Sequence, residues 1–311
     1  MVIKRSTTID DKEWRTFVTV VDEGNITKAA EKLFVSQPAL SYRLRHLEDS
    51  VGYSLLLRTT EGIALTPQGE IYYDYCKRML HDREALEHAL TSSTGKIQGT
   101  LKIASSINFA DYELPALLKS FREQYPDVHI QVKTAFSHQV VKMFNTGDCM
   151  VAFARGGYEV SGNSELLLEE PYCLVYKELV PPESLEKVPF IRYQTDASVA
   201  NIIEKWCAEH FEAPPIVAMD VNSMSTCRHF VRAGLGWSIL TYMGLGSCKD
   251  KDIYVSPLRS KDGTYITRDT NMVYTKESAN LIAVKTFIEY VRDYYKKHTV
   301  VDDSIFREYQ S

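Results

Sequence analysis

The chain has 311 residues, of which 44% are hydrophobic and 25% are charged, and its formal net charge is −5. This composition is typical of an ordinary folded protein and excludes a disordered, collagen-like or strongly basic chain. At roughly 100–200 residues per domain, the length predicts two or three domains. The longest apolar runs are far shorter than the ~20 residues that span a bilayer, and the N-terminus lacks the apolar core of a secretory signal. We therefore expect a cytoplasmic protein with no membrane partner.

The cysteines and histidines follow no spacing typical of a metal site, and we expect neither a metal nor a cofactor. No nucleophile motif, phosphate-binding loop or triad spacing appears, so no catalytic residue is predicted and an enzyme is not expected. In a reducing compartment the cysteines are expected to be packed thiols, and a redox-sensing pair is the alternative. The six cysteines are Cys76, Cys149, Cys173, Cys207, Cys227 and Cys248.

The first 66 residues predict three short helices followed by a small wing. Apolar residues recur at helical spacing over residues 11–22 and 28–34, and a third helix begins after Ser36, which can cap it, and ends at Gly52. Two short strands, 55–60 and 63–66, flank a glycine turn. A tight turn between the second and third helices is typical of a helix-turn-helix.

The third helix has one apolar face and one polar face. Leu40, Leu44 and Leu47 form the apolar stripe. On the opposite face, Gln can pair with adenine edges, Arg with guanine edges, and hydroxyl groups with phosphates. An ordinary solvated helix face is the alternative. The candidate DNA-binding residues, including one on the wing, are Ser36, Gln37, Pro38, Ser41, Tyr42, Arg45 and Arg58.

A long helix is predicted from Pro67 to about residue 92, with the region 67–94 as a linker and dimerisation segment. Its apolar positions alternate in steps of four and three, with Arg83 in one slot, which is the spacing of a coiled-coil seam. A seam on a single helix needs a partner, so a dimer is expected; packing against its own domain is the alternative. The seam residues are Tyr72, Cys76, Met79, Leu86 and Leu90.

From Gly99 onward, short apolar strands alternate with helices, which predicts an α/β domain with a mostly parallel sheet and helices on both faces. About 210 residues suit two small lobes. Helices are expected around 114–121 and at 139–145, 198–210, 224–233 and 279–296. Strands are expected at 101–104, 128–132, 151–153, 190–193, 216–219, 237–240, 253–255 and 272–274.

Polar side chains stand where several of these strands end and helices begin, a position that favours anionic ligands. We expect a small organic anion there, held mainly by hydroxyl groups and amides because no Lys or Arg lies in these turns. Capping of the helices by the same Ser and Asn side chains is the alternative. The candidate effector-binding residues are Ser105, Ser106, Asn108, Ser137, Gln194, Thr195, Asn222, Ser223 and Met224.

One long run carries a family resemblance. Residues 27–41 read Thr-Lys-Ala-Ala-Glu-Lys-Leu-Phe-Val-Ser-Gln-Pro-Ala-Leu-Ser and are followed by Leu44-Arg45, Leu47-Glu48 and Gly52. This run resembles the N-terminal signature of LysR-type transcriptional regulators. The segment that begins at Gly99 and the run Val231–Gly236 are similar to later landmarks of the family, so the resemblance covers about residues 10–296.

The resemblance implies a winged helix-turn-helix (1–66), a dimerisation helix (67–94) and a two-lobed periplasmic-binding-protein-like α/β effector domain (95–311). Lobe 1 would comprise about 95–164 and 269–311, and lobe 2 about 165–268. Family members commonly form homotetramers from two dimers. Two departures concern the pocket: Gly147-Asp148 places an acid earlier than the family often does, and Thr241 stands where the family often has Pro.

The predicted function is that of a sequence-specific DNA-binding transcriptional regulator, modulated by a small-molecule inducer that is an organic anion or related to an amino acid. Its expected partners are double-stranded DNA, the effector and further copies of itself, and RNA polymerase is a partner that this role admits. The alternatives are a redox-responsive regulator of the same fold and, from another class, a two-lobed enzyme or solute receptor.

Overall fold

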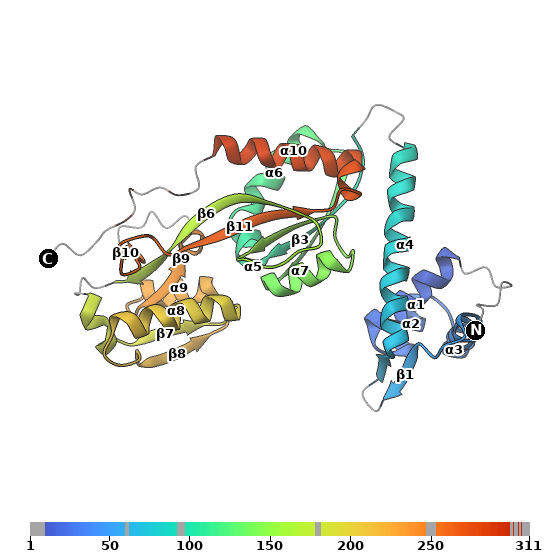
Figure 1. The fold of residues 1–311 in the computed structure, drawn as a ribbon, viewed down its shortest axis with the longest axis horizontal. Helices are drawn as coiled ribbons and strands as arrows, with labels where there is room; N and C mark the ends of the chain where they lie inside the picture. Colours follow the sequence, from blue (N-terminus) through green and yellow to red (C-terminus); the bar gives the residue numbers. More distant parts are fainter. Residues whose placement is uncertain are drawn as a thin grey trace. The chain divides into compact units, whose positions relative to one another are not determined.

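The computed structural model describes residues 10–59, 62–91, 97–177, 182–246 and 253–298, together with 301, 304 and 306. The chain divides into two compact units at about residue 95. Figure 1 shows both units with their helices and strands labelled.

The first unit contains three short helices, a two-stranded antiparallel wing and one long helix. Asn25 and Ser36 cap the second and third helices by accepting hydrogen bonds from backbone N–H groups. Gly24 and Gly52, at φ of 58° and 81°, end the first and third helices in the left-handed region that glycine tolerates. The elements are α1 (Asp11–Glu23), α2 (Ile26–Lys32), α3 (Gln37–Val51), β1 (Leu56–Thr59), β2 (Gly62–Leu65) and α4 (Pro67–Thr91).

The core of this unit includes the first turns of the long helix α4. Tyr72 and Cys76 are buried with the apolar faces of α1 to α3, and the rings of Tyr72 and Phe17 meet edge to face at 5.1 Å. A Cβ atom at Gly69 would collide with the backbone carbonyl of Leu55, so α4 approaches the wing as closely as only a glycine permits. The start of α4 is therefore fixed against the wing.

The second unit is built on a mixed seven-stranded sheet in the order β10-β6-β11-β5-β3-β4, with β9 also paired to β6. Strands β7 and β8 form a separate parallel pair. The strands are β3 (Gly99–Ser106), β4 (Val128–Ala135), β5 (Val151–Arg155), β6 (Asn163–Tyr176), β7 (Phe190–Tyr193), β8 (Val217–Val221), β9 (Ser238–Thr241), β10 (Tyr254–Pro257) and β11 (Thr267–Tyr274).

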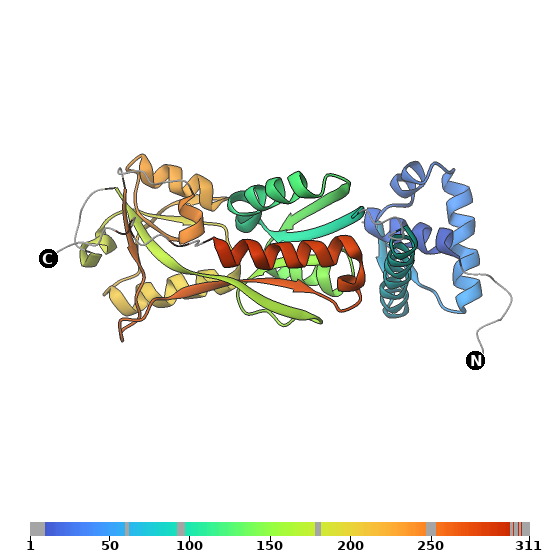
Figure 2. The same ribbon diagram turned by 90° about the horizontal axis from the view of Figure 1, so that it is seen from above.

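Helices cover these sheets. Helix α10 packs on β3 and on α6, as Figure 2 shows from above, while α8 and α9 belong to the half of the unit that holds β7 and β8. The helices are α5 (Ile107–Tyr112), α6 (Leu114–Gln124), α7 (Ser137–Asn145), α8 (Ala197–His210), α9 (Met224–Arg232) and α10 (Ile282–Lys297), with short 3₁₀ turns at Pro182–Lys187, Tyr242–Leu245 and Ser278–Asn280.

The expectation of a mostly parallel sheet is wrong. Strand β3 pairs in parallel with β4 and β5, but β11 pairs antiparallel with β5 and β6, and β6 pairs antiparallel with β9 and β10. The cause is that the long strand β6 runs antiparallel to β11 in one part of the unit and antiparallel to β9 and β10 in the other (Figure 1).

Strand β6, which was not expected from the sequence, changes partners along its length. It pairs with β11 up to Pro171 and with β9 from Tyr172. The expected lobe boundaries, at 164/165 and 268/269, fall in β6 and β11, and they stay a prediction. Below, lobe 1 means the part with β3, β4 and β5, and lobe 2 the part with β7, β8 and β9.

Candidate functional site

The polar face of α3 is largely exposed, as expected. Gln37, Tyr42 and Arg45 lie on it, and Tyr42 is 71% exposed. Ser36 and Pro38 are exposed at its first turn. The side chain of Arg58 lies outside the described part of the chain, so its expected role stays a prediction.

Ser41 departs from this expectation, because it is only 9% exposed. Its hydroxyl group accepts a hydrogen bond from Nε2 of Gln37, 3.1 Å away. Ser41 therefore positions the Gln37 side chain on the helix surface, and its predicted place on the outward face is corrected. Phe34, which was not singled out in the sequence, is 96% exposed in the turn before α3 and has a positive φ of 54°.

The expected seam of α4 is only partly accessible. Tyr72 and Cys76 lie in the core of the first unit, so the alternative of packing within its own domain holds for these two residues. By contrast, Ile71 and Leu86 are 71% and 59% exposed. Met79 is partly exposed, and the side chain of Leu90 lies outside the described part.

The strand ends of the second unit converge on one small cavity between its lobes. Strands β3, β4 and β5 are parallel neighbours, so Ser106, Ser137 and Arg155 meet at one edge of the sheet. From lobe 2, the segments after β7 and β8 reach the same cavity. Its volume is about 50 Å³.

All the expected effector-binding residues except Ser105 line this cavity. Ser105 is fully buried, and its hydroxyl group donates to the backbone carbonyl of Ser106. Ser223 caps α9 by accepting a hydrogen bond from the backbone N–H of Thr226 at 3.1 Å, so the capping alternative describes Ser223. Ser137 accepts a hydrogen bond from the backbone N–H of Arg155 at 3.2 Å.

Two buried arginines also line the cavity, although no Arg or Lys lies in the turns from which the ligand contacts were expected. Arg155, 1% exposed, donates from Nη2 to the carboxylate of Glu170 and, at 3.1 Å, to the hydroxyl group of Thr241. Glu170 also accepts from the backbone N–H of Met243. Thr241, one of the two departures noted in the sequence, therefore accepts a hydrogen bond from Arg155.

Arg268, on β11, belongs to a second set of contacts, which links the lobes. Its Nη2 lies 3.4 Å from Oδ2 of Asp196, at the start of α8 in lobe 2. Asp196 also contacts lobe 1, where its carboxylate lies 2.9 Å from Nδ1 of His138 and accepts from the backbone N–H of Ser137 at 3.3 Å. Asp196 thus holds the two lobes together across the cavity.

Burial affects the pKa of Arg155. Burial, together with the nearby charge of Arg268, lowers the pKa of Arg155 to about 9, which leaves its guanidinium group protonated at neutral pH. The carboxylates of Glu170 and Asp196 are correspondingly placed to balance the two positive charges. The signal in the sequence was Arg155 itself, a charged residue at the end of the otherwise apolar strand Val151–Arg155.

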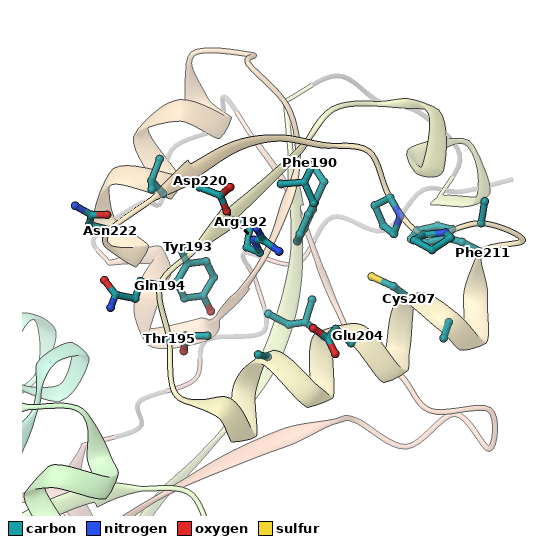
Figure 3. A pocket seen from close by; sticks show the side chains of 18 of the residues that line it. Phe190, Arg192, Tyr193, Gln194, Thr195, Glu204, Cys207, Phe211, Asp220 and Asn222 are labelled. Atoms are coloured by element: carbon teal, nitrogen blue, oxygen red, sulfur yellow. Dashed lines mark hydrogen bonds and ion pairs between the residues drawn. The ribbon is translucent and has the colours of Figure 1, made fainter.

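A larger pocket of about 890 Å³ lies within lobe 2, between α8 and the pair β7–β8 (Figure 3). Phe190, Ile203 and Phe211 give it an apolar lining, and an exposed ion pair joins Arg192 and Asp220. The charged side chains that line this pocket are exposed, whereas Arg155 and Arg268 of the interlobe cavity are buried.

The described cysteines have the burial that is typical of packed thiols. Cys76, Cys149, Cys173, Cys207 and Cys227 are all buried. Burial raises the pKa of Cys207 and of Cys227 to about 11, so both thiols are protonated at neutral pH. Cys248 lies outside the described residues.

Thiol labelling tests this expectation directly. Because a thiol with a pKa near 11 holds about 100-fold less thiolate than a free one, Cys207 and Cys227 should react with a thiol reagent at least that much more slowly in the folded protein than in urea. Mass spectrometry of the labelled peptides gives both rates. Fast labelling of the folded protein at Cys207, or its oxidation by micromolar peroxide, would favour the redox alternative.

Neither metal ligation nor membrane insertion is indicated by the described residues. They contain no group of three or more His, Cys, Asp or Glu side chains placed to hold a metal ion. None of the helices in this part of the chain is both long and apolar enough to cross a membrane.

A winged helix-turn-helix with a long helix, followed by a two-lobed α/β unit with a polar interlobe cavity, defines the class of DNA-binding regulators that carry an effector domain. The family models agree. Residues 12–70 match the bacterial regulatory helix-turn-helix protein, lysR family, and residues 94–296 match the LysR substrate binding domain. The chain belongs to the LysR family of transcriptional regulators, which are not enzymes, and the resemblance seen in the sequence is confirmed.

Individual relatives cover nearly the whole chain. The uncharacterized HTH-type transcriptional regulator YraN of Bacillus subtilis is 34% identical over 284 residues, which are 91% of this chain and 98% of that protein. Among solved structures, a variant of full-length OxyR from Pseudomonas aeruginosa has a TM-score of 0.67 at 20% identity and covers 94% of this chain and 99% of its own. Full-length CbnR in complex with its target DNA has a TM-score of 0.61 at 20% identity, with 91% and 99% covered. These structures support the fold.

Proposed function

We propose that this LysR-family regulator reads a specific DNA site with α3 and that its binding to that site changes when a small molecule binds in the interlobe cavity. The observation that carries the proposal is the exposed polar face of α3, with Gln37 held by Ser41 and Arg45 nearby. In this arrangement Gln37 and Arg45 contact base edges in the major groove, and Ser36 and the first amides of α3 contact a phosphate.

DNA discrimination is expected to depend on the two base-reading side chains. Gln37→Ala and Arg45→Ala should each cost about 1–3 kcal/mol of binding free energy at one position of the site while the fold survives, because both side chains are exposed. Fluorescence anisotropy on DNA from upstream of the gene, compared with scrambled DNA, measures the loss. Arg15→Ala, which removes an exposed residue of α1, is the matched control. Unchanged discrimination in both variants would refute the assignment.

The pairing surface for a second copy is proposed to be the exposed face of α4. Ile71, Tyr75 and Leu86 recur along it at helical spacing, and each is at least 39% exposed. Such an apolar face on an isolated helix is typical of a dimer seam. A dimer would place two α3 helices in successive major grooves, about one helical turn of DNA apart.

The oligomeric state of the protein, its polymerase partner and its cellular location are proposed on the basis of the same role. A homotetramer made of two dimers, and RNA polymerase as a partner at the promoter, complete the proposal, and the site of action is the cytoplasm. The comparison with CbnR supports the DNA part, because that protein was solved with its target DNA.

The effector is proposed to bind where the two lobes meet. Ser106, Ser137 and Asn108 from lobe 1 face Thr195 and Asn222 from lobe 2 across the cavity. A ligand that contacts both lobes can change the angle between them, and so bias the geometry of the DNA-binding helices. Operator binding measured with and without a ligand that stabilises the protein tests this coupling.

A further inference from the structure

Four residues that line the interlobe cavity each carry a hydrogen-bond donor that lacks a partner among the described residues. These donors are the hydroxyl groups of Ser106 and Tyr193 and the Nε atoms of Arg155 and Arg268. Each of these residues is at least 94% buried. A buried polar atom without a hydrogen bond is costly, so the convergence of four in one place points to a binding site.

The two buried carboxylates that contact the arginines are already engaged. The carboxylate of Glu170 accepts from Arg155 and from the backbone N–H of Met243. That of Asp196 accepts from Arg268 and from the backbone N–H of Ser137, and it also contacts His138. In the buried part of the cavity a ligand ammonium group would have to displace one of these partners, whereas a ligand oxygen would find donors without partners. The carboxylate of Asp111 also lines the cavity, but it is exposed to solvent.

The size of the cavity restricts the ligand further. At about 50 Å³ it has room for a few water-sized groups, whereas pockets for drug-sized molecules measure roughly 300–1,000 Å³. A tetrahedral oxyanion or a short carboxylate is of this size. The two guanidinium groups supply the planar, forked donors that such anions prefer.

We propose that the cleft recognises a small oxyanion, anchored by Arg155 and Arg268 and hydrogen-bonded by Ser106 and Tyr193, in preference to a zwitterionic amino acid. This inference rests on the proposed function of the cleft as the effector site. It also replaces the expectation that hydroxyl groups and amides alone hold the ligand.

The test uses two substitutions that remove no hydrogen bond shown within the protein. Ser106→Ala and Tyr193→Phe each delete one of the unpartnered hydroxyl groups. Calorimetry on the full chain with sulfate, phosphate, oxalate and acetate measures the affinities, and glycine serves as the ammonium-bearing counterpart of acetate. We expect at least one anion to bind, acetate to bind more tightly than glycine, and each substitution to weaken the tightest anion roughly 10- to 100-fold.

Thr270→Val is the matched control. Thr270 also has a buried hydroxyl group without a partner, but it does not line the cavity. This nearly isosteric variant should therefore keep the affinity of the wild type. The inference is overturned if none of the four anions binds, if glycine binds more tightly than acetate, or if both hydroxyl deletions bind the anion as the wild type does.

Operator binding by the wild type and by the DNA-reading variants tests the proposed function separately. If the anion results fail while Gln37→Ala still loses discrimination between DNA sites, the ligand class is wrong and the regulator assignment stands.

Discussion

Replacing Glu170 by alanine is expected to lower the free energy of unfolding of the second unit by about 3–5 kcal/mol. Glu170 is fully buried, and its carboxylate is the partner of the equally buried Arg155. Removing it leaves a buried guanidinium group that, among the described residues, keeps the Thr241 hydroxyl as a hydrogen-bond partner but loses its ion pair. The cost comes mainly from the stranded charge and not from the lost attraction.

Two further variants separate these contributions. The double variant Arg155→Met with Glu170→Leu removes both charges and should recover most of the loss, because well-packed apolar residues often replace a buried ion pair at little cost. Glu165→Ala, which breaks the partly exposed pair with Arg292, should cost no more than about 1 kcal/mol.

Urea unfolding followed by tryptophan fluorescence measures these changes. A Trp14→Phe background leaves Trp206 and Trp237, which both lie in lobe 2, as the reporters. A loss below about 1 kcal/mol for Glu170→Ala would show that the pair is not the buried ion pair described here.

The second large effect is expected at the exposed face of α4, which is the proposed pairing surface for a second copy. Ile71→Asp and Leu86→Asp should both yield monomers, since each places a charge in an apolar seam at a cost of several kcal/mol. Met79→Asp should act in the same direction. A monomer contacts only one half-site, so affinity for a two-half-site operator should fall at least ~100-fold.

Sedimentation and anisotropy measure the two outcomes, with Glu70→Ala on the exposed flank of α4 as the control. Because Ile71 and Leu86 are exposed within their own unit, the monomers should remain folded. Intact dimers in both Asp variants would contradict the proposed surface. Cys76→Asp is expected to behave differently and unfold the first unit, because Cys76 lies in its core.

Local signals in the sequence predicted the first unit well. The capping residues Asn25 and Ser36 and the terminating glycines act on their own helix ends, so their effect is legible in the sequence. The prediction for α4 differs from the structure because two of the expected seam residues, Tyr72 and Cys76, lie in the core of the first unit. Helix α4 has two apolar faces, and spacing alone does not tell whether the face of Ile71 or that of Tyr72 packs within the unit.

The second unit was harder to predict because its decisive contacts are long-range. Strand β6 was missed since Pro171 and several glutamates interrupt the apolar pattern of a strand that changes partners midway. Ser106 and Ser137 were found because they follow strands directly. Arg155 and Arg268 contact each other although 113 residues separate them, and no sequence spacing reports such a contact.

The most direct test of the central claim measures operator binding by the full-length protein while the tightest-binding small anion is titrated. We expect the anion to change operator affinity or DNA bending, and we expect this response to require roughly 10- to 100-fold more anion in Ser106→Ala and in Tyr193→Phe. The Thr270→Val control should respond as the wild type does. Operator binding that ignores the anion at saturation, or that responds identically in both hydroxyl deletions, would contradict the account.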